Sequence, residues 1–315
     1  MPENRVAVID IGTNSVLLLV CEVTPVDGAL TVLLDTGEIT RLGYGLNTTG
    51  RLEAAAIERA FAVLKTFTQR AESLGASRIA AIGTSALRIA SNANDLINQV
   101  ERELGIDVKV ISGETEAYYT YLAVRSDTAF YNRLSGQQLV LIDIGGGSTE
   151  VVIGREKVER CWSLNLGAVY LSERFLNHDP PTEAEVKALA STVVATLAEQ
   201  VDLPVEKRST LAGVGGTLVN LAAVKLRLMA YSASRIHGTT LSQHEITAQI
   251  RRFCGVGLAE RMTIPGLEPK RADVIIAGAV ILLGIMTYAG VEQVYVSVRG
   301  ARYGAMYDLA MSYER

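Results

Sequence analysis

The sequence predicts an α/β protein built from two homologous halves. Two near-copies of one motif carry this prediction. A run of apolar β-forming residues ends in Asp10 and again in Asp143, and each run is followed by a glycine-containing turn and a second apolar run. Strand and helix signals then alternate after both copies. The chain has 315 residues, which is enough for two domains with sizeable cores.

The first half begins with apolar, β-branched runs that predict a meander of three strands at 5–10, 15–23 and 29–36. Helical spacing of apolar residues follows over 54–74, and Gly75 ends that helix. The remaining signals of this half are, in order, a strand at 78–83, a turn at 84–88, a helix at 93–104, a strand at 108–111 and a helix at 112–126.

The second half restarts the same pattern after a polar linker at 126–137. A proline pair before Thr182 marks the start of one of its helices. In order, we expect strands at 139–143, 149–154 and 157–163, helices at 167–177 and 182–200, a strand at 210–213, helices at 217–227, 243–253 and 271–289, a strand at 293–298 and a last helix at 303–311.

Composition and charge limit the classes of function. Hydrophobic residues make up 49% of the chain and charged residues 20%, which is typical of a globular protein. The net charge is −4, so nucleic-acid binding is not favoured, and a polyanionic substrate would need a local group of cations. The uncharged run 274–291 is expected to be a buried helix and not a membrane span, because Asp273 and Glu292 flank it closely.

The cysteines and the N-terminus indicate a cytoplasmic protein. Cys21, Cys161 and Cys254 are odd in number and have no metal-ligand spacing, so we expect reduced, buried thiols. Asp10 follows the first apolar run at once, which is unlike a signal peptide.

The two turns suit an anion. Glycine lets the backbone approach a phosphate closely, and successive N–H groups form a nest for its oxygens. A carboxylate beside such a nest repels phosphate, and its natural partner is Mg²⁺, which takes carboxylate and phosphate oxygens together. A single turn of this kind is usually only structural, but a duplicated one indicates a site between two halves. The expected phosphate-binding residues are Gly12, Thr13, Asn14 and Ser15 in the first turn and Gly145, Gly146, Gly147 and Ser148 in the second.

Further candidates lie outside these turns. Gly215, Gly216 and Thr217 precede a helix, where backbone N–H groups again converge. Glu114 opens a helix, where acidic residues are also common because they complement the helix dipole. Alternation puts Glu150 on the same side of its strand as Ser148, either as a solvated charge or as a ligand for Mg²⁺ or water.

The chain resembles the superfamily of sugar kinases, actin and heat-shock ATPases. Within it the chain is most similar to the exopolyphosphatase and guanosine pentaphosphate phosphohydrolase (Ppx/GppA) family. The segments that carry the resemblance span nearly the whole chain in the family's order: 9–15, 84–88, 111–117, 143–150, 213–217, 237–238 and 271–275.

The resemblance implies a fold of two ribonuclease-H-like domains, as in actin-like ATPases, with an interdomain cleft. The first domain would cover 1–130 and be joined by a C-terminal helix at 300–315, and the second would cover 131–299. The third turn, which holds adenosine in sugar kinases, would here lie beside later phosphates or bind a guanosine nucleotide.

The resemblance also implies roles for individual residues. Glu114 matches the general base, while Glu116 is expected to face away from it on the helix. Arg88 matches a phosphate clamp, and Asp10, Asp143 and Glu150 are the expected Mg²⁺ ligands, with Glu150 also placed near the catalytic water. His237 is expected to have a structural role or to make a minor phosphate contact. Arg299, in a segment that resembles the family's glycine-rich closing segment with substitutions, is expected in the substrate channel.

The implied activity is Mg²⁺-dependent release of orthophosphate from the end of inorganic polyphosphate. Three alternatives stay open: hydrolysis of guanosine pentaphosphate, a kinase of the same superfamily, and a regulator of the stringent response that binds guanosine tetraphosphate without hydrolysis. We expect no nucleic-acid or membrane partner, and a homodimer stays open.

Overall fold

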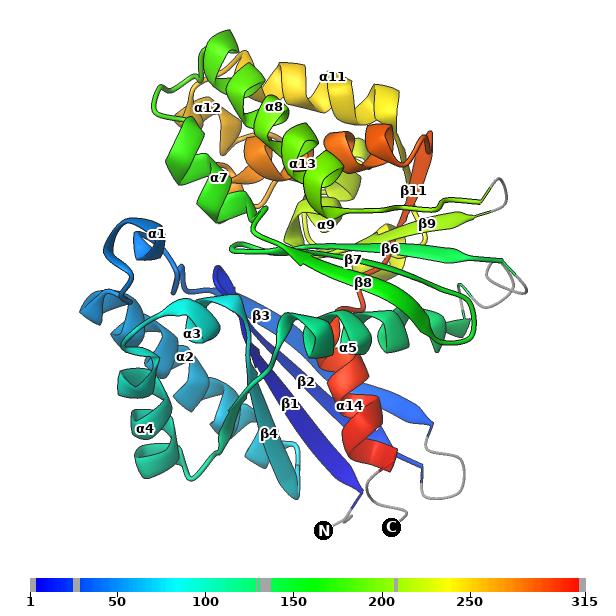
Figure 1. Cartoon of the computed structure of the whole chain (residues 1–315). Coiled ribbons are helices and arrows are strands. Elements are labelled where there is room, and N and C mark those ends of the chain that lie inside the picture. The colour runs from blue at the N-terminus through cyan, green and yellow to red at the C-terminus, as the bar shows by residue number, and fades with distance from the viewer. Residues whose placement is uncertain (1–3, 25–28, 129, 131–136, 207–208, 312–315) are drawn as a thin grey trace. The chain divides into compact units, whose positions relative to one another are not determined.

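The computed structural model describes residues 4–24, 29–128, 130, 137–206 and 209–311, and these divide into two compact units (Figure 1). Unit 1 comprises the described residues up to Ala123 and those from Ala301 onward. Unit 2 comprises the described residues of Val124–Gly300. The boundary falls within helix α5 (Gly113–Arg125), shortly before the linker at which the sequence predicts it.

Unit 1 contains a five-stranded sheet in the order β3-β2-β1-β4-β5. The first three strands form the predicted antiparallel meander, and the other two continue the sheet in parallel from β1. The strands are β1 (Arg5–Ile11), β2 (Ser15–Val23), β3 (Leu30–Ile39), β4 (Arg78–Gly83) and β5 (Val108–Val110).

Helices cover both faces of this sheet. Alternate residues of a strand point to opposite faces, so Ile9 packs with Phe67 on one face while Val8 packs with Met306 on the other. The first face is covered by α2 (Ala54–Ser73) and α4 (Ala93–Leu104), and the second by α5 and the C-terminal helix α14 (Ala301–Met311).

Unit 2 contains a six-stranded sheet in the order β10-β11-β9-β6-β7-β8. Again an antiparallel meander of three strands continues in parallel through two more. The strands are β6 (Leu139–Ile144), β7 (Thr149–Gly154), β8 (Val158–Leu164), β9 (Thr210–Val214), β10 (Thr240–Ser242) and β11 (Gln293–Val296).

The repeated topology explains the duplicated motif. The order β3-β2-β1-β4-β5 of unit 1 corresponds to β8-β7-β6-β9-β11 of unit 2, and β10 is an added edge strand. Asp10 and Asp143 occupy equivalent places near the ends of β1 and β6. The predicted α/β fold of two related, ribonuclease-H-like domains is thereby confirmed.

The longer helices of unit 2 lie close to their predicted positions. They are α7 (Ala168–Phe175), α8 (Glu183–Gln200), α9 (Gly216–Lys225), α11 (Gln243–Cys254) and α13 (Ile275–Tyr288). The predicted helix at 271–289 begins later than expected, at Ile275, because Arg271 ends a separate 3₁₀ helix, η1 (Pro269–Arg271), and residues 272–274 form a turn.

Five of the short elements in the described residues were not predicted. The segment 84–88, which the sequence predicts to be a turn, is mostly helical. The elements without a prediction are α1 (Leu46–Thr49), α3 (Ser85–Ile89), α10 (Ala233–Ile236), β10 and α12 (Leu258–Arg261). Elements this short contain too few residues to show a period of hydrophobic spacing.

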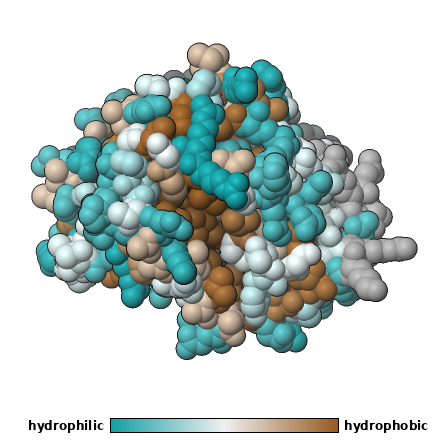
Figure 2. All heavy atoms as spheres, turned by 90° about the horizontal axis from the view of Figure 1, so that it is seen from above, coloured by the Kyte–Doolittle hydropathy of each residue, from teal (hydrophilic) through white to brown (hydrophobic). Residues whose placement is uncertain are grey.

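The uncharged segment 274–291 forms a packed helix of unit 2. Most residues of α13 are buried in the main core of the unit, against α7, α8 and α11. Among the described residues no helix is both long and apolar enough to cross a membrane. On the face shown in Figure 2, hydrophilic residues cover much of the surface around a central band of apolar ones.

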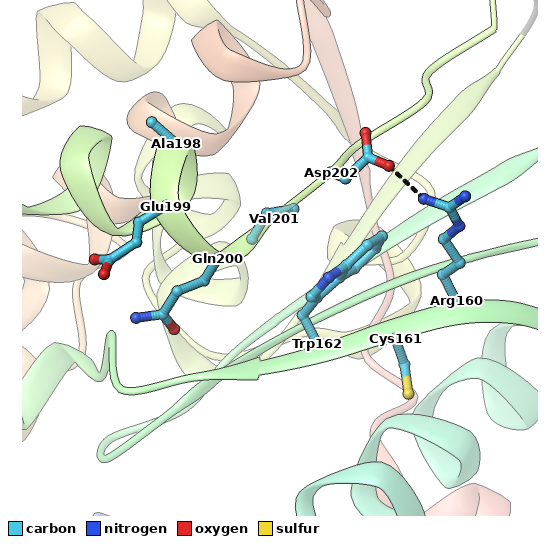
Figure 3. Close-up of a pocket in the computed structure, with 8 residues that line it drawn as sticks. All are labelled: Arg160, Cys161, Trp162, Ala198, Glu199, Gln200, Val201 and Asp202. Carbon is cyan, nitrogen blue, oxygen red and sulfur yellow. Dashed lines mark hydrogen bonds and ion pairs between the residues drawn. The ribbon is translucent and has the colours of Figure 1, made fainter.

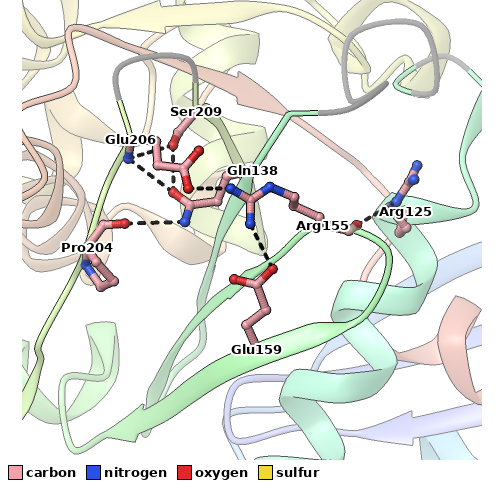
Figure 4. A network of polar contacts seen from close by, with 7 residues as sticks. All are labelled: Arg125, Gln138, Arg155, Glu159, Pro204, Glu206 and Ser209. Carbon is pink, nitrogen blue, oxygen red and sulfur yellow. Dashed lines mark hydrogen bonds and ion pairs between the residues drawn. The ribbon is translucent and has the colours of Figure 1, made fainter.

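Polar contacts fix the turn between β7 and β8 in unit 2 (Figure 4). Arg155 on this turn forms ion pairs with Glu159 and Glu206, and its carbonyl accepts a hydrogen bond from Arg125 Nε at 2.8 Å. Gln138 bonds in turn to Pro204 O, Glu206 N and Ser209 Oγ. The loop before β9 is thereby tied to the β7–β8 hairpin.

The three cysteines are free, as predicted. The expectation that all three are buried is wrong for two of them. Cys21 lies in the core of unit 1, whereas Cys161 and Cys254 are half-buried. Burial raises the pKa of the Cys254 thiol, which makes it less reactive.

Candidate active site

The first turn closes the β1–β2 hairpin as predicted. Gly12 N donates to Ser15 O at 2.9 Å, and a Cβ on Gly12 would lie 2.9 Å from that oxygen, so the tight turn favours glycine. Thr13 and Asn14 are buried. Within the described part of the chain, the N–H groups of Thr13 and Asn14 bond to no other residue, as a phosphate-binding turn requires.

A segment after β3 wraps the first turn. Thr40 N and Arg41 N both donate to Asn14 O at 3.0 Å, and Gly43 N donates to Thr13 O at 2.8 Å. Arg41 has φ 51, a left-handed conformation that is uncommon outside glycine. Nothing in the residue pattern indicates that Arg41 packs against the first turn, because arginine is not a residue type typical of the left-handed conformation.

Arg88 lies on α3, not on a turn. Thr84 N, just before this helix, donates to Ile11 O at 3.1 Å and so ties α3 to the end of β1. Arg88 Nη1 donates to Ile111 O at 2.8 Å and to Glu116 Oε2 at 3.1 Å. The side chains of Arg88 and Glu116 are 26% and 12% exposed, so this ion pair is partly shielded from water.

Glu116 therefore has a partner that the sequence did not predict. Residues two apart on a helix point in different directions, so Glu114 and Glu116 diverge as predicted. Glu116 is the one that contacts Arg88. Glu114 is exposed in the first turn of α5, where Ser112 Oγ accepts from Thr115 N at 3.1 Å. The catalytic role expected of Glu114 is not tested by these contacts.

The second turn repeats the first in unit 2. Gly145 N donates to Ser148 O at 2.9 Å, and Ala168 N and Val169 N donate to the carbonyls of Gly145 and Gly146. A Cβ on Gly167 would lie 2.1 Å from Gly146 O, so α7 begins directly against the turn. In the described residues, no hydrogen bond joins the N–H groups of Gly146 and Gly147 to another residue.

Two carboxylates lie side by side next to this turn. Asp143 of β6 is paired in register with Glu150 of β7, and residues paired across an antiparallel ladder point to the same face. Glu150 is 1% exposed, and Ser163 Oγ donates to its Oε1 at 2.8 Å. Like charges in this position are unfavourable unless a cation or a proton lies between them.

Asp143 and Glu150 suit a Mg²⁺ ion that is held partly by protein and partly by phosphate and water. No group of three or more His, Cys, Asp or Glu residues in the described chain is arranged to hold a metal ion. Mg²⁺ is commonly held by only one or two carboxylates together with phosphate oxygens and water. Asp143 and Glu150 fit that mode and not a cage made of protein ligands alone.

The third turn lies against the same aspartate. Gly215 has φ +96, and a Cβ there would lie 3.1 Å from Asp143 Oδ1. A Cβ on Gly216 would lie 2.1 Å from the Arg271 guanidinium, so the arginine packs directly on the start of α9. Burial lowers the pKa of Arg271, and the charges of Glu268 and Asp273 oppose this effect. Thr217 is buried.

Arg271 is a site residue for which the sequence suggested no role. It belongs to a segment that resembles the family, but nothing in the residue pattern connects it with Gly216. The chain therefore brings a carboxylate, a guanidinium and two glycine turns together in unit 2.

His237 and Arg299 share one buried partner in unit 2. His237 Nε2 lies 3.0 Å from Asp127 Oδ2, and Arg299 Nε lies 3.3 Å from the same oxygen. Asp127 is 1% exposed, and the His237 ring meets the Phe130 ring edge-on with centroids 5.3 Å apart. The structural role is the one of the two expected roles of His237 with which this contact agrees, and Arg299 contacts the same carboxylate.

One cavity in the structure contains none of the predicted site residues (Figure 3). It measures about 450 Å³ and lies between β8 and the end of α8, where Trp162 and the Arg160–Asp202 ion pair line it. No glycine turn or paired carboxylate borders it, so we assign it no part in the chemistry.

Comparison with known proteins places this geometry in a family. The model of the Ppx/GppA phosphatase family matches residues 19–313. The chain is 31% identical over 322 residues to exopolyphosphatase 2 of Mycobacterium tuberculosis, covering 98% of this chain and 100% of that protein. It is 32% identical to a guanosine-5'-triphosphate,3'-diphosphate pyrophosphatase of Aeromonas hydrophila, covering 96% of this chain and 59% of that protein.

A solved structure agrees with the fold. The crystal structure of the Ppx/GppA family member of Aquifex aeolicus superposes with a TM-score of 0.81 at 36% identity, covering 99% of both chains.

Proposed function

Because this chain belongs to the Ppx/GppA phosphatase family, we propose that it is an exopolyphosphatase, which releases orthophosphate from the end of inorganic polyphosphate. Hydrolysis of a phosphoanhydride is the reaction that the names of both curated relatives share. The observation that carries the proposal is the contact between Arg88 and Glu116. It joins a phosphate-binding guanidinium to a carboxylate that can take a proton from water.

The residues of unit 1 supply the binding and proton-accepting groups. Water attacks the terminal phosphorus in line, the bond to the bridging oxygen breaks, and the shortened chain leaves with that oxygen. Arg88 binds oxygens of the terminal phosphate, and the N–H groups of Thr13 and Asn14 bind further oxygens. A carboxylate orients the water and accepts its proton.

Two glutamates compete for the role of general base. Glu114 is the residue that family resemblance suggests, and it stays a candidate. We rank Glu116 ahead of it, because Glu116 Oε2 lies 3.1 Å from Arg88 Nη1 whereas Glu114 is exposed on the first turn of α5. A phosphate that binds Arg88 competes with Glu116 for the guanidinium and leaves that carboxylate beside the reacting group.

We assign Mg²⁺ to Asp143 and Glu150, and to Asp10 at the equivalent place in unit 1. The ion, when bound, neutralises charge on the phosphate oxygens and so favours attack by water. Asp143→Asn keeps the size of the side chain and removes its charge. We expect loss of most Mg²⁺-dependent phosphate release from a folded protein, and unaltered Mg²⁺ activation in that variant would refute the assignment.

One experiment distinguishes polyphosphate from guanosine pentaphosphate as the preferred substrate. Phosphate release is measured from polyphosphate and from guanosine pentaphosphate at equal concentration, with Mg²⁺ present. Faster release from polyphosphate is expected. Faster release from guanosine pentaphosphate would favour the second candidate function, which the similarity to the Aeromonas hydrophila protein supports.

Two further alternatives have their own readouts. Binding of guanosine tetraphosphate without hydrolysis of any polyphosphate would favour a regulator of the stringent response, and ATP-dependent phosphorylation of a small alcohol would favour a kinase. We further propose a cytoplasmic location, with which the three free thiols agree. Sedimentation of the purified protein would decide whether it forms a homodimer.

A further inference from the structure

The cavity between β8 and the end of α8, called here the Trp162 cavity, is large enough for a small organic molecule. It measures about 450 Å³. One wall is the middle of β8, from Arg160 to Trp162, and the other is the segment from Ala198 to Asp202, which ends α8 and follows it. All of these residues belong to unit 2, so the cavity is complete within that unit.

Trp162 supplies an apolar, aromatic wall. It is the only tryptophan of the chain, and it is half-buried against the main core of unit 2. Figure 3 shows its indole extending from β8 toward Val201 and Asp202. Among aromatic side chains the indole binds cations best, and the aliphatic stems of cationic groups lie readily along apolar surface of this kind.

The end of α8 makes the opposite wall electronegative. The carbonyl groups of the last turn of a helix carry partial negative charge, which favours a cation nearby. Helix α8, whose residues are all described, has no basic residue in its last turn. That turn contains Glu199, whose carboxylate lines the cavity. The helix end and Glu199 would therefore both stabilise a cation in the cavity.

The basic residue of this lining is already paired. Arg160 Nη1 lies 2.6 Å from Asp202 Oδ2, and the two side chains are 52% and 84% exposed. The pair neutralises both of its charges, so the lining keeps the negative charge of Glu199. A phosphate group is disfavoured by that charge. An exposed ion pair contributes little to stability, so a second cation can compete with Arg160 for Asp202.

We propose that the Trp162 cavity binds a small aliphatic polyamine. The methylene chain lies along the indole and Val201, one ammonium group lies near Glu199 and the end of α8, and another lies near Asp202. Tyr288 OH donates to Val201 O at 2.6 Å, so α13 fixes this wall before the ligand binds. The ligand is opposite in charge to the substrate of the proposed function, and its site is separate from the phosphate-binding turns.

The single tryptophan makes the test specific. Its emission is recorded while spermidine is added to the whole protein without polyphosphate, at an ionic strength held constant with NaCl. We expect a saturable change, because the bound chain replaces water around the indole. Isothermal titration calorimetry gives the affinity independently. Neither measurement depends on phosphate release, so failure of the proposed function would leave this test intact. Absence of saturable binding in both would overturn the proposal.

Two variants predict changes of opposite sign. Glu199→Gln should weaken spermidine binding about 2- to 5-fold, which is the range expected for an exposed ion pair. Arg160→Gln should strengthen binding by a similar factor, because it removes the cation that competes for Asp202. The matched control is Glu183→Gln, which removes the same charge from the first turn of α8 and should leave the affinity unchanged.

Equal affinities of Glu199→Gln and Glu183→Gln would show that spermidine binds acidic surface in general, and would overturn the proposal. Tighter binding of guanosine diphosphate than of spermidine, lost in Arg160→Gln, would make the cavity an anion site and would overturn it as well. Both glutamates and Arg160 are exposed, so these variants test binding without disturbing the core.

Discussion

At the scale of single residues, Arg88 and Glu116 decide how the chemistry of unit 1 is assigned. Glu116 is bonded to the guanidinium that the sequence predicts to bind phosphate, whereas Glu114 lies exposed on the same helix. The two glutamates are alike in size and charge and differ in what they contact. Their comparison therefore isolates the effect of position near Arg88.

We expect Glu116→Gln to lower turnover about 10²- to 10⁴-fold, because glutamine keeps the volume but cannot accept a proton from water at neutral pH. Glu114→Gln should cost little, and it serves as the matched control. Phosphate release under saturating polyphosphate measures both. The opposite result, with Glu114→Gln the impaired variant, would restore the assignment that family resemblance suggests.

The partners of these side chains could not be predicted from the sequence. Both turns and both aspartates could be predicted because their pattern is duplicated, and the role of Arg88 was predicted from the resemblance to the family. The pairing of Arg88 with Glu116, or of Arg271 with Gly216, depends on how separate segments pack. That packing cannot be predicted from the residue types along the chain.

At the scale of elements, the sequence predicted the longer helices and every described strand except β10. The pattern over α2 is long enough to show its 3.6-residue period, and the strands of both meanders alternate or are continuously apolar. The helix α3 spans only Ser85–Ile89 and was expected to be a turn. A single helical turn is too short to show a repeating pattern of apolar residues, so which of its residues are buried depends on the neighbouring elements.

The contact between α5 and α14 depends on a glycine. A Cβ on Gly304 would lie 1.9 Å from the carbonyl oxygen of Tyr119, so the two helices approach more closely there than any side chain permits. Tyr119 OH donates to Asp308 Oδ2 at 3.0 Å across the same contact. Burial and this bond raise the pKa of Tyr119 to about 12, which keeps the hydroxyl protonated.

Gly304→Ala should destabilise the protein by about 1–3 kcal/mol, because backbone must shift to relieve the overlap. The free energy of unfolding in urea measures the loss. Tyr119→Phe is the comparison, since it removes only the hydroxyl bond, which contributes about 1 kcal/mol. A Gly304→Ala protein as stable as wild type would mean that α14 has room to move away from α5.

At the scale of the whole molecule, the two units differ in how the chain builds them. Unit 2 is one continuous stretch, Val124–Gly300, with its own core of strands and helices. Unit 1 is discontinuous, because its sheet is completed on one face by α14, which follows all of unit 2. Without α14, Val8 and Leu19 would lose apolar neighbours, and Asp35 would lose Arg302.

The last prediction follows from that asymmetry. A fragment of residues 124–300 should fold alone and unfold cooperatively. A fragment of residues 1–123 should not, because it exposes one face of its sheet and leaves the half-buried Asp35 without Arg302. Circular dichroism during thermal unfolding measures both. Addition of a peptide of residues 301–315 should restore cooperative unfolding to the first fragment. Cooperative unfolding of residues 1–123 without that peptide would show that α14 is dispensable for the fold of unit 1.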